Sequence, residues 1–422
     1  MDNMPLSHLA ESLIGSEIVR LGNEIKDKIR QGRHIYNFTI GDFDSRFFPI
    51  PAELENAITE AYREGYTNYP PAEGMLELRE SVGHFLRERE GIDYAPSEIL
   101  IASGGRPLIY ALYRTIVDKG EKVIYTVPSW NNNHYVHFVE GAHVPIETTA
   151  AEQFMPTADQ IKPLLEGASL LALCSPLNPT GTSFSKAQLE AICDAVLEEN
   201  ARRGEGAKKL YVMYDQMYWM LTYGDTVHYN PVSLRPALKE YVIFIDGISK
   251  AFAATGLRVG WAFGPERVIA KMKAILSHMG AWAPMAEQKA TAGYLLQTEN
   301  VDRYLHLFKD GLEKRLTGIY QGFIALKKAG FAVDAIAPQA AIYLTVQFDL
   351  RGRRTPSGKV LSSQDDVTAY LLETAGLAIV PFKIFGAGAG SAWYRLSVGT
   401  CDLADIPEML GAVRQALEGL KS

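Results

Sequence analysis

Side chains that can act together on one small molecule stand directly after short apolar runs of this sequence. They supply an indole, an amide, a carboxylate, a phenol, an amine and a guanidinium, from Trp130, Asn178, Asp215, Tyr218, Lys250 and Arg258. Taken singly, each has an ordinary structural explanation, such as a core aromatic, a turn, a helix cap or a solvated charge. Gathered at one edge of a sheet, they have the chemistry to hold a flat, anionic, electrophilic cofactor through an imine.

Seven short runs of β-branched and aliphatic residues are the elements that would position these side chains. Continuous apolar runs of this length are typical of strands buried on both faces, as in a mostly parallel sheet covered by helices. Ligands of such open sheets bind outside the carboxyl ends of the strands. The predicted strands are 99–102, 123–127, 143–147, 170–174, 210–214, 242–245 and 258–263, with helical periodicity between them, as over 185–200.

The turn after the first predicted strand, Ser103-Gly-Gly-Arg-Pro107, suits a phosphate group. Its two glycines let the backbone approach a ligand closely, and Pro107 suits the first position of a helix predicted over 108–117. The start of a helix offers free N–H groups and a positive dipole to an anion. A Gly-Gly turn is weak evidence alone, since most such turns only connect elements.

Both ends of the chain have a different pattern. Apolar residues recur at helical spacing over 18–29 and again through a helix-rich stretch at 283–329. Two further strands are predicted at 341–348 and 393–398, and a last helix at 406–420. We therefore expect a central α/β domain of about 250 residues, flanked by smaller α+β material from both chain ends.

Composition limits the partners and the compartment. The 422 residues carry 42 Lys and Arg against 49 Asp and Glu, a net charge of −7, which argues against nucleic-acid or anionic-membrane partners. Three scattered cysteines form no disulfide framework or metal cluster, so we expect a reducing compartment and no metal. With no signal peptide and no apolar stretch long enough for a membrane span, the prediction is a cytoplasmic protein.

The ordered set of motifs resembles the fold type I pyridoxal-phosphate enzymes, in the class I/II aminotransferase group that includes aspartate aminotransferase. The resemblance covers nearly the whole chain, and the lysine segment is its most specific part. The motifs are Ile40-Gly-Asp-Phe-Asp44, Tyr69-Pro-Pro-Ala-Glu-Gly74, Trp130, Asn178-Pro-Thr-Gly181, Asp215-x-x-Tyr218, Ser249-Lys-Ala-Phe-Ala-x-Thr-Gly-x-Arg258 and Tyr394-Arg-Leu-Ser397.

The resemblance implies an α/β fold with a mostly parallel seven-stranded sheet sandwiched by helices and a smaller α+β domain. The large cofactor domain would span residues 49–300, and the small domain would combine 1–48 with 301–422. The implied reaction moves an amino group from an α-amino acid to a 2-oxo acid by a ping-pong mechanism. The cofactor would be pyridoxal 5′-phosphate.

The resemblance also implies roles around the cofactor ring. Lys250 would form the Schiff base and then carry the proton between the substrate and the cofactor. Asp215 would keep the pyridine nitrogen protonated, which makes the ring an electron sink. Asn178 and Tyr218 would hydrogen-bond the ring's phenolic oxygen, and Trp130 would stack on the ring.

The remaining roles concern the phosphate, the substrate and a second subunit. Backbone groups of the glycine turn and the Arg258 guanidinium would hold the phosphate, and Tyr69 would reach it from the neighbouring subunit of a homodimer with shared active sites. Arg395 would clamp the substrate α-carboxylate in a bidentate pair, beside Gly41 and Asn178. The turn residues concerned are Gly104, Gly105 and Arg106.

Three departures from the family pattern bear on substrate choice. Gly247 stands where many members have a phosphate-binding serine, and the loop over 42–48 replaces a shorter Glu-Pro-Asp loop. No arginine occurs over 277–284, where some aspartate-specific enzymes bind the second carboxylate; Trp282 and His278 stand there instead. Strict aspartate specificity is therefore not predicted, although Arg46 or another residue could substitute.

Two other functions stay open from the sequence. The same fold and cofactor also serve β-lyases, decarboxylases and cyclopropane-forming synthases, because the outcome depends on which substrate bond aligns with the ring. A non-enzymatic regulator could use the fold to sense an effector. That hypothesis is disfavoured, because only about forty residues precede Gly41 and the net charge is −7.

Overall fold

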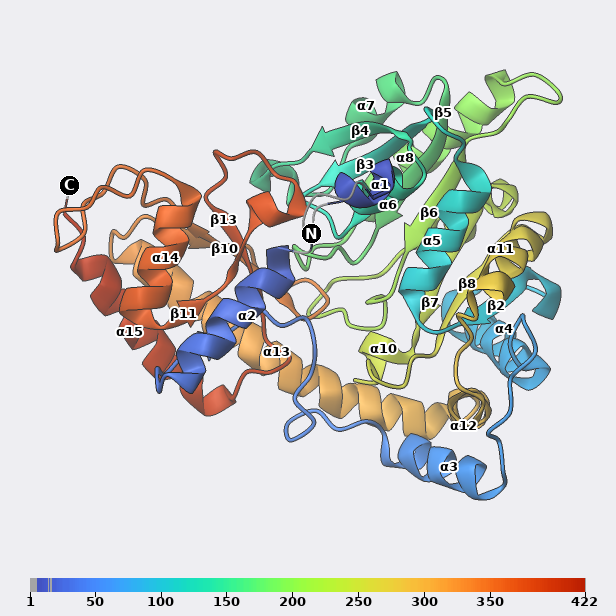
Figure 1. The fold of residues 1–422 in the computed structure, drawn as a ribbon, viewed down its shortest axis with the longest axis horizontal. Helices are drawn as coiled ribbons and strands as arrows, with labels where there is room; N and C mark the ends of the chain where they lie inside the picture. Colours follow the sequence, from blue (N-terminus) through green and yellow to red (C-terminus); the bar gives the residue numbers. More distant parts are fainter. Residues whose placement is uncertain (1–5, 14, 16, 422) are drawn as a thin grey trace.

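A seven-stranded sheet forms the centre of the larger part of the molecule (Figure 1). The computed structural model describes residues 6–13, 15 and 17–421. Strands β7, β6, β5, β3 and β4 run parallel, and β8 pairs antiparallel with β7 and β2, which confirms the prediction of a mostly parallel sheet. The strands are β2 (Ile99–Ala102), β3 (Lys122–Val127), β4 (Ala142–Glu147), β5 (Ala168–Cys174), β6 (Tyr211–Asp215), β7 (Val242–Gly247) and β8 (Gly260–Phe263).

Helices cover both faces of this sheet and create two separate apolar cores. One core is built on α5 (Gly105–Ile116), α6 (Asn132–Phe138) and α11 (Glu266–Met279). The other is built on α3 (Ala52–Arg63), α4 (Leu76–Glu90), α7 (Ala158–Ile161), α8 (Lys186–Arg202), α9 (Pro231–Leu234), α10 (Ile248–Ala251) and α12 (Met285–Leu295). Burial on both faces explains why β7 reads as a continuous apolar run.

A smaller antiparallel sheet, of order β12-β13-β10-β9, lies in the part of the molecule formed by the C-terminal residues (Figure 1). Its strands are β9 (Val333–Ala335), β10 (Tyr343–Phe348), β12 (Val380–Pro381) and β13 (Trp393–Ser397). Apolar side chains of α13 (Thr298–Lys328), α14 (Gln364–Ala375) and α15 (Ile406–Glu418) form its core.

Both chain ends meet in this smaller part. Strand β1 (Tyr36–Asn37) pairs parallel with β11 (Leu377–Ala378), and Ile25 of α2 (Glu17–Arg30) packs against Leu372. The short helix α1 (His8–Glu11) precedes α2. The predicted division at residues 48 and 300 stays a prediction, and α13 runs across the second boundary.

Two predicted boundaries differ from those in the structure. The helix after the glycine turn begins at Gly105, so Pro107 is its third residue and not its first. Proline is tolerated there because the N–H groups of the first turn have no partner within the helix. The last strand of the large sheet begins at Gly260, which leaves Arg258 in the preceding loop. Among the described residues, no helix is long and apolar enough to cross a membrane.

Candidate active site

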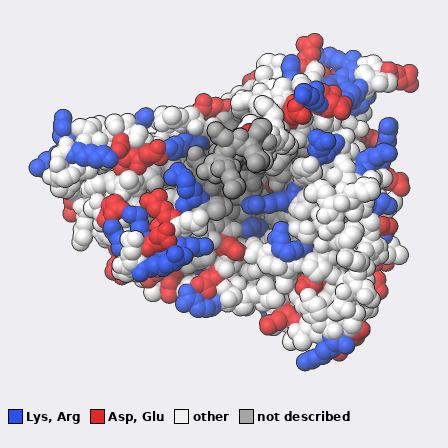
Figure 2. Space-filling view, viewed as in Figure 1, with Lys and Arg blue, Asp and Glu red and all other residues white. Residues whose placement is uncertain are grey.

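The carboxyl edge of the large sheet brings the predicted cofactor residues together. Asp215 is the last residue of β6, Lys250 lies in α10 directly after β7, and Asn178 follows β5. Trp130 follows β3, and the helix that starts at Gly105 follows β2. On the face shown in Figure 2, the surface is hollowed between the two parts of the molecule, and Lys and Arg side chains lie in this hollow.

Three glycines let adjacent segments of the site approach one another closely. A Cβ at Gly260 would lie 2.8 Å from Gly104 Cα, and one at Gly247 would lie 2.8 Å from Gly260 Cα. Gly104 has a φ of +88°, and a Cβ there would lie 2.3 Å from the Arg258 guanidinium. The close approach of these segments leaves no room for a serine side chain at position 247. The same approach places Arg258 over the glycine turn, where its Nη2 donates to Ser103 O at 3.0 Å.

Lys250 is enclosed, and no carboxylate of the described residues is hydrogen-bonded to it. Its Nζ donates to Gly41 O at 2.6 Å and lies 5.7 Å and 5.8 Å from the ring centroids of Phe43 and Tyr218. Burial lowers the pKa of this amine to about 8, with nearby arginines acting in the same direction and Asp42 against it. About one amine in ten is then neutral at pH 7, which makes Lys250 a usable nucleophile and base.

Asp215 and Tyr218 face the same space from the turn after β6. Asp215 Oδ1 accepts from Met217 N–H at 3.1 Å, and burial raises the pKa of this carboxyl to about 6. A carboxyl with this pKa is mostly ionised at pH 7, and its carboxylate can hold a protonated ring nitrogen. The Tyr218 and Tyr343 hydroxyls share a hydrogen bond of 2.6 Å.

Arg395 reaches the site from β13 of the small sheet. Its side chain is buried, with Nη2 donating to Thr39 O at 2.7 Å and Nη1 to Asn178 Oδ1 at 3.2 Å. The guanidinium carbon lies 4.7 Å from the Tyr343 ring and 5.0 Å from the Phe385 ring. Its Nε is buried without a hydrogen-bond partner in the described part of the chain. This arrangement fixes the plane of the guanidinium and leaves it uncompensated.

Arg106 contributes its side chain as well as its backbone. Its guanidinium carbon lies 5.3 Å from the Trp130 ring centroid, and that ring lies 6.3 Å from Phe385. Within the described ranges, none of Arg106, Lys250, Arg258 and Arg395 forms an ion pair with a carboxylate. Four cations without an ion pair at one sheet edge, of which Arg395 is buried and Arg106 is exposed, are the arrangement expected for anionic ligands.

Two predicted residues lie elsewhere or are engaged otherwise. Tyr69 is 84% exposed, and its ring packs edge-on against Trp282 at 5.3 Å. Arg46 is also exposed, and its guanidinium pairs with Asp44 at 2.7 Å. Arg46 is therefore compensated, unlike Arg106.

Sequence reasoning missed Phe385, Phe43 and the Arg106 side chain. Phe385 follows β12 of the small sheet, so the rule that places ligands at the strand ends of the large sheet did not reach it. Phe43 lies in the loop over 42–48, which the sequence marked only as unusual. For Arg106 the signal was present, since its backbone already belonged to the predicted phosphate turn.

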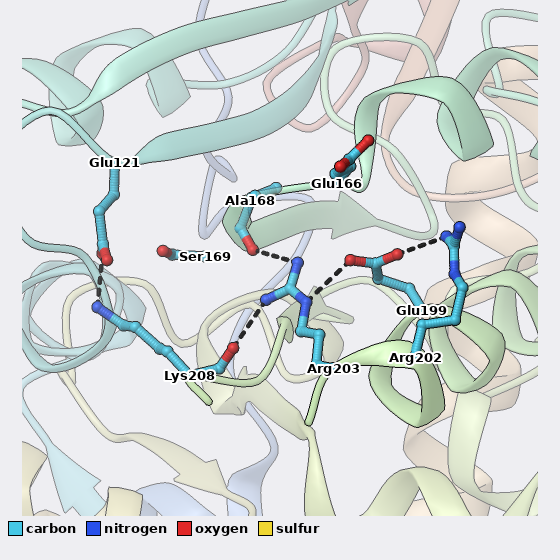
Figure 3. Close-up of a pocket in the computed structure, with 9 residues that line it drawn as sticks. Glu121, Glu166, Ala168, Ser169, Glu199, Arg202, Arg203 and Lys208 are labelled. Carbon is cyan, nitrogen blue, oxygen red and sulfur yellow. Dashed lines mark hydrogen bonds and ion pairs between the residues drawn. The ribbon is translucent and has the colours of Figure 1, made fainter. Parts of the chain in front are cut away.

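A second charged region lies at the amino edge of the same sheet (Figure 3). This cavity of about 470 Å³ lies between the start of β5 and the end of α8. Arg203 donates to the backbone carbonyls of Leu165 and Ala168 and pairs with Glu199 at 2.9 Å. Lys208 pairs with Glu121 at 2.5 Å. The basic side chains of this cavity are already paired within the chain, so we assign the cavity a structural role.

Comparisons with known proteins agree with the site. The family model for aminotransferase class I and II matches residues 33–413. The chain belongs to this family. It is 27% identical over 408 residues to an aspartate aminotransferase of Rhizobium meliloti (strain 1021), covering 96% of this chain and 94% of that one. It is 29% identical over 387 residues to the aspartate aminotransferase of Geobacillus stearothermophilus, covering 91% and 92%.

Solved structures give the same result for this aminotransferase. The aspartate aminotransferase of Rhizobium meliloti aligns with a TM-score of 0.90 at 26% identity, covering 99% of this chain and 100% of that one. The Thermus thermophilus aspartate aminotransferase with maleate aligns with a TM-score of 0.86 at 27% identity, covering 98% and 100%. The protein is a pyridoxal-phosphate-dependent aminotransferase, and the lyase, synthase and regulator hypotheses are not favoured.

The residues present fit that cofactor. A phosphate needs a backbone cradle, and the cradle at Gly104 exists only because no Cβ fills it. A pyridine nitrogen needs a buried carboxylate, which Asp215 supplies. An aldehyde needs an amine of lowered pKa, which Lys250 supplies.

Proposed function

We propose that this aminotransferase takes an acidic α-amino acid, of the aspartate kind, as amino donor and passes the amino group to a 2-oxo acid in a ping-pong cycle. The observation that carries the proposal is the set of four uncompensated cations at the carboxyl edge. A cofactor phosphate and one α-carboxylate account for Arg258 and Arg395. Arg106 remains for a second carboxylate. The names of several relatives, aspartate aminotransferase, support this choice.

The geometry supports a role for each residue at the cofactor. Pyridoxal phosphate supplies an aldehyde carbon for an amine and a ring that withdraws electrons from the substrate. Asp215 would hold the ring nitrogen, Trp130 would cover the ring face, and Asn178 with Tyr218 would bind the phenolic oxygen. The phosphate would be held by Arg258 and by backbone N–H groups of Gly104, Gly105 and Arg106.

Lys250 would hold and move the proton. Its Nζ would take a proton from the substrate α-carbon and deliver it, during the same half-reaction, to the cofactor carbon that had carried the aldehyde. Because its pKa is lowered to about 8, the amine is neutral often enough to act as a base and protonated often enough to act as an acid. A base placed in this way contributes about 10²- to 10⁴-fold.

Arg395 would orient the substrate through its α-carboxylate. Thr39 O and Asn178 Oδ1 hold the guanidinium in place, and the Tyr343 and Phe385 rings flank it. A bidentate pair fixes the amino acid about the carboxylate. Gly41 lies beside this site, where a Cβ would come 2.8 Å from the Tyr343 hydroxyl.

The donor proposal is tested by a panel of amino donors with 2-oxoglutarate and pyruvate as acceptors. We expect aspartate and glutamate to be preferred over alanine, and Arg106→Gln to lower kcat/KM for aspartate by about 10-fold or more with little change for alanine. Arg46→Gln is the matched control, since Arg46 already pairs with Asp44. Equal loss for acidic and neutral donors in Arg106→Gln would place Arg106 at the cofactor and refute its role with the second carboxylate.

We also propose a cytoplasmic homodimer in which Tyr69 completes the partner's site. The support is the large exposure of Tyr69, which a second chain would cover, and the free cysteines Cys174, Cys193 and Cys401. Mixing refolded Lys250→Ala and Tyr69→Ala variants should restore activity, because one site of the mixed dimer is intact. No recovery in verified mixed dimers would contradict shared sites.

A further inference from the structure

We propose that Asp246 is a positioning residue, which holds the segment carrying Lys250 and the turn carrying Asp215 and Tyr218 in a fixed relation. This inference rests on the proposed roles of those three residues. Asp246 precedes Gly247 at the end of β7 and is 2% exposed. It lies outside the substrate space and would act only through the residues it connects.

Each oxygen of the Asp246 carboxyl serves one of the two segments. Oδ1 accepts from the Gly247 N–H at 2.7 Å, directly before α10, which carries Lys250. Oδ2 accepts from the Trp219 indole N–H at 2.9 Å, and Trp219 directly follows Tyr218. One side chain therefore joins the lysine segment to the aspartate–tyrosine turn.

The backbone ladder between β6 and β7 ends where this connection begins. The paired residues end at Asp215 and Ile245, and the next bond runs from Gln216 N–H to Ile245 O at 3.0 Å. Beyond that point β6 has ended, whereas β7 continues to Gly247 in its pairing with β8. The Asp246–Trp219 hydrogen bond links the segments after the ladder has ended.

A second buried carboxyl, that of Glu90, accepts a hydrogen bond from the turn that follows β6. Glu90 accepts from Gln216 Nε2 at 2.6 Å and from Asn230 Nδ2 at 3.1 Å, and burial raises the pKa of Glu90 to about 7. Gln216 follows Asp215 in the chain and is fully buried. Apolar residues could fill this part of the interior at a lower desolvation cost than these polar groups. What the polar network adds is hydrogen bonds of defined direction.

The test compares Asp246→Asn and Trp219→Phe in the cofactor-loaded protein. An asparagine offers one acceptor oxygen to two N–H donors, and a phenylalanine removes the indole donor. We expect kcat to fall about 10-fold in each variant while the KM of the amino donor stays within about twofold, because Arg395 is held by other elements. The visible circular dichroism of the bound cofactor should change, since it reports ring orientation. The double variant should be no slower than Asp246→Asn, because both changes break one connection.

The control removes two hydrogen bonds just before the amino end of β6, the strand whose carboxyl end carries Asp215. Asn200 Nδ2 donates to Leu210 O at 2.9 Å, and Asn200 Oδ1 accepts from Leu210 N–H at 2.8 Å, just before β6. Asn200→Ala should lower Tm with kcat and circular dichroism unchanged. If Asp246→Asn and Trp219→Phe behave like this control, Asp246 is only structural and the proposal fails.

Two further outcomes are decisive. If Asp246→Asn does not fold, Trp219→Phe, which keeps a ring in place, decides by the same two readouts. Lys250→Ala reports on the proposed function instead: a covalent link between cofactor and chain that persists in this variant, detected by mass spectrometry after borohydride reduction, would refute the role of Lys250, whatever the Asp246 variants do.

Discussion

The two edges of the large sheet both carry clustered charges, and they use them in opposite ways. At the amino edge, Arg203 lies between Glu199 and two backbone carbonyls, and Lys208 pairs with Glu121 (Figure 3). At the carboxyl edge, the hydrogen bonds of Lys250 and Arg395 to other described residues go to carbonyl or amide oxygens.

The difference shows what marks a site in this fold. A cavity lined by charges is present at the amino edge, yet its bases are already paired within the chain. At the carboxyl edge Arg395 is buried and forms no ion pair within the described residues, which costs folding free energy unless an anion binds. Compensation of charge, and not the presence of charge or of a cavity, separates the ligand site from the structural one.

The largest expected effect is that of Lys250→Ala. Loss of both the nucleophile and the base should lower kcat by more than about 10⁴-fold, since general base catalysis alone contributes about 10² to 10⁴. Transamination rates and visible absorbance measure this. Lys208→Ala at the amino edge is the matched control and should keep kcat; equal losses in both would erase the distinction between the edges.

The next largest effect is expected for Arg395→Lys. A lysine keeps the charge but cannot form the bidentate pair, so kcat/KM for the amino donor should fall by about 10²-fold. Steady-state kinetics with varied donor concentration measure it. An unchanged kcat/KM would show that the buried guanidinium is a structural group, as Arg203 is at the other edge.

Arg203→Ala should affect stability and not catalysis. The Arg203 side chain is 12% exposed and that of Glu199 5%, so the pair is largely buried. Its loss should lower the free energy of unfolding by roughly 2 to 3 kcal/mol, because Glu199 keeps Arg202 as a partner. Urea unfolding with kcat per folded molecule tests this. A fall in kcat without loss of stability would contradict the structural role.

The smallest expected effect is a difference between Lys250 and Lys208 in the pH at which each amine becomes reactive. Lys250 should lose its proton as pH rises through about 8, because burial lowers its pKa. Burial acts the same way on Lys208, but hydrogen bonds with Glu121 and Asp118 outweigh it and raise the pKa of Lys208 above its ordinary value. An amine reagent applied to cofactor-free protein across pH, with modification mapped by mass spectrometry, should therefore label Lys250 first.

In the same assay, Arg106→Gln should move the Lys250 midpoint upward by a few tenths of a pH unit, because it removes a nearby positive charge. Labelling of Lys208 before Lys250 would overturn the contrast between the two edges.

Most of the large sheet could be predicted from the sequence, because strands buried on both faces need unbroken apolar runs. The run over 242–245 became β7, which ends at Gly247. The helix start at Gly105 was missed, since Pro107 suits any position of the first turn and its identity does not select one. The functions of Phe385 and Phe43 could not be foreseen, because neither follows a strand of the large sheet.

The sequence by itself determined which chemical groups stand at the carboxyl edge, because the ends of neighbouring strands converge and each motif directly follows its strand. Only the tertiary structure decided which charges stay uncompensated. Arg46 pairs with Asp44 and Arg203 with Glu199, whereas Arg106 has an aromatic ring beside it and Lys250 has the carbonyl of Gly41. Asp44 and Glu199 lie only two and four residues from the arginines they bind, whereas the groups beside Arg106 and Lys250 come from other segments of the chain. The distances between those segments are fixed only when the elements pack.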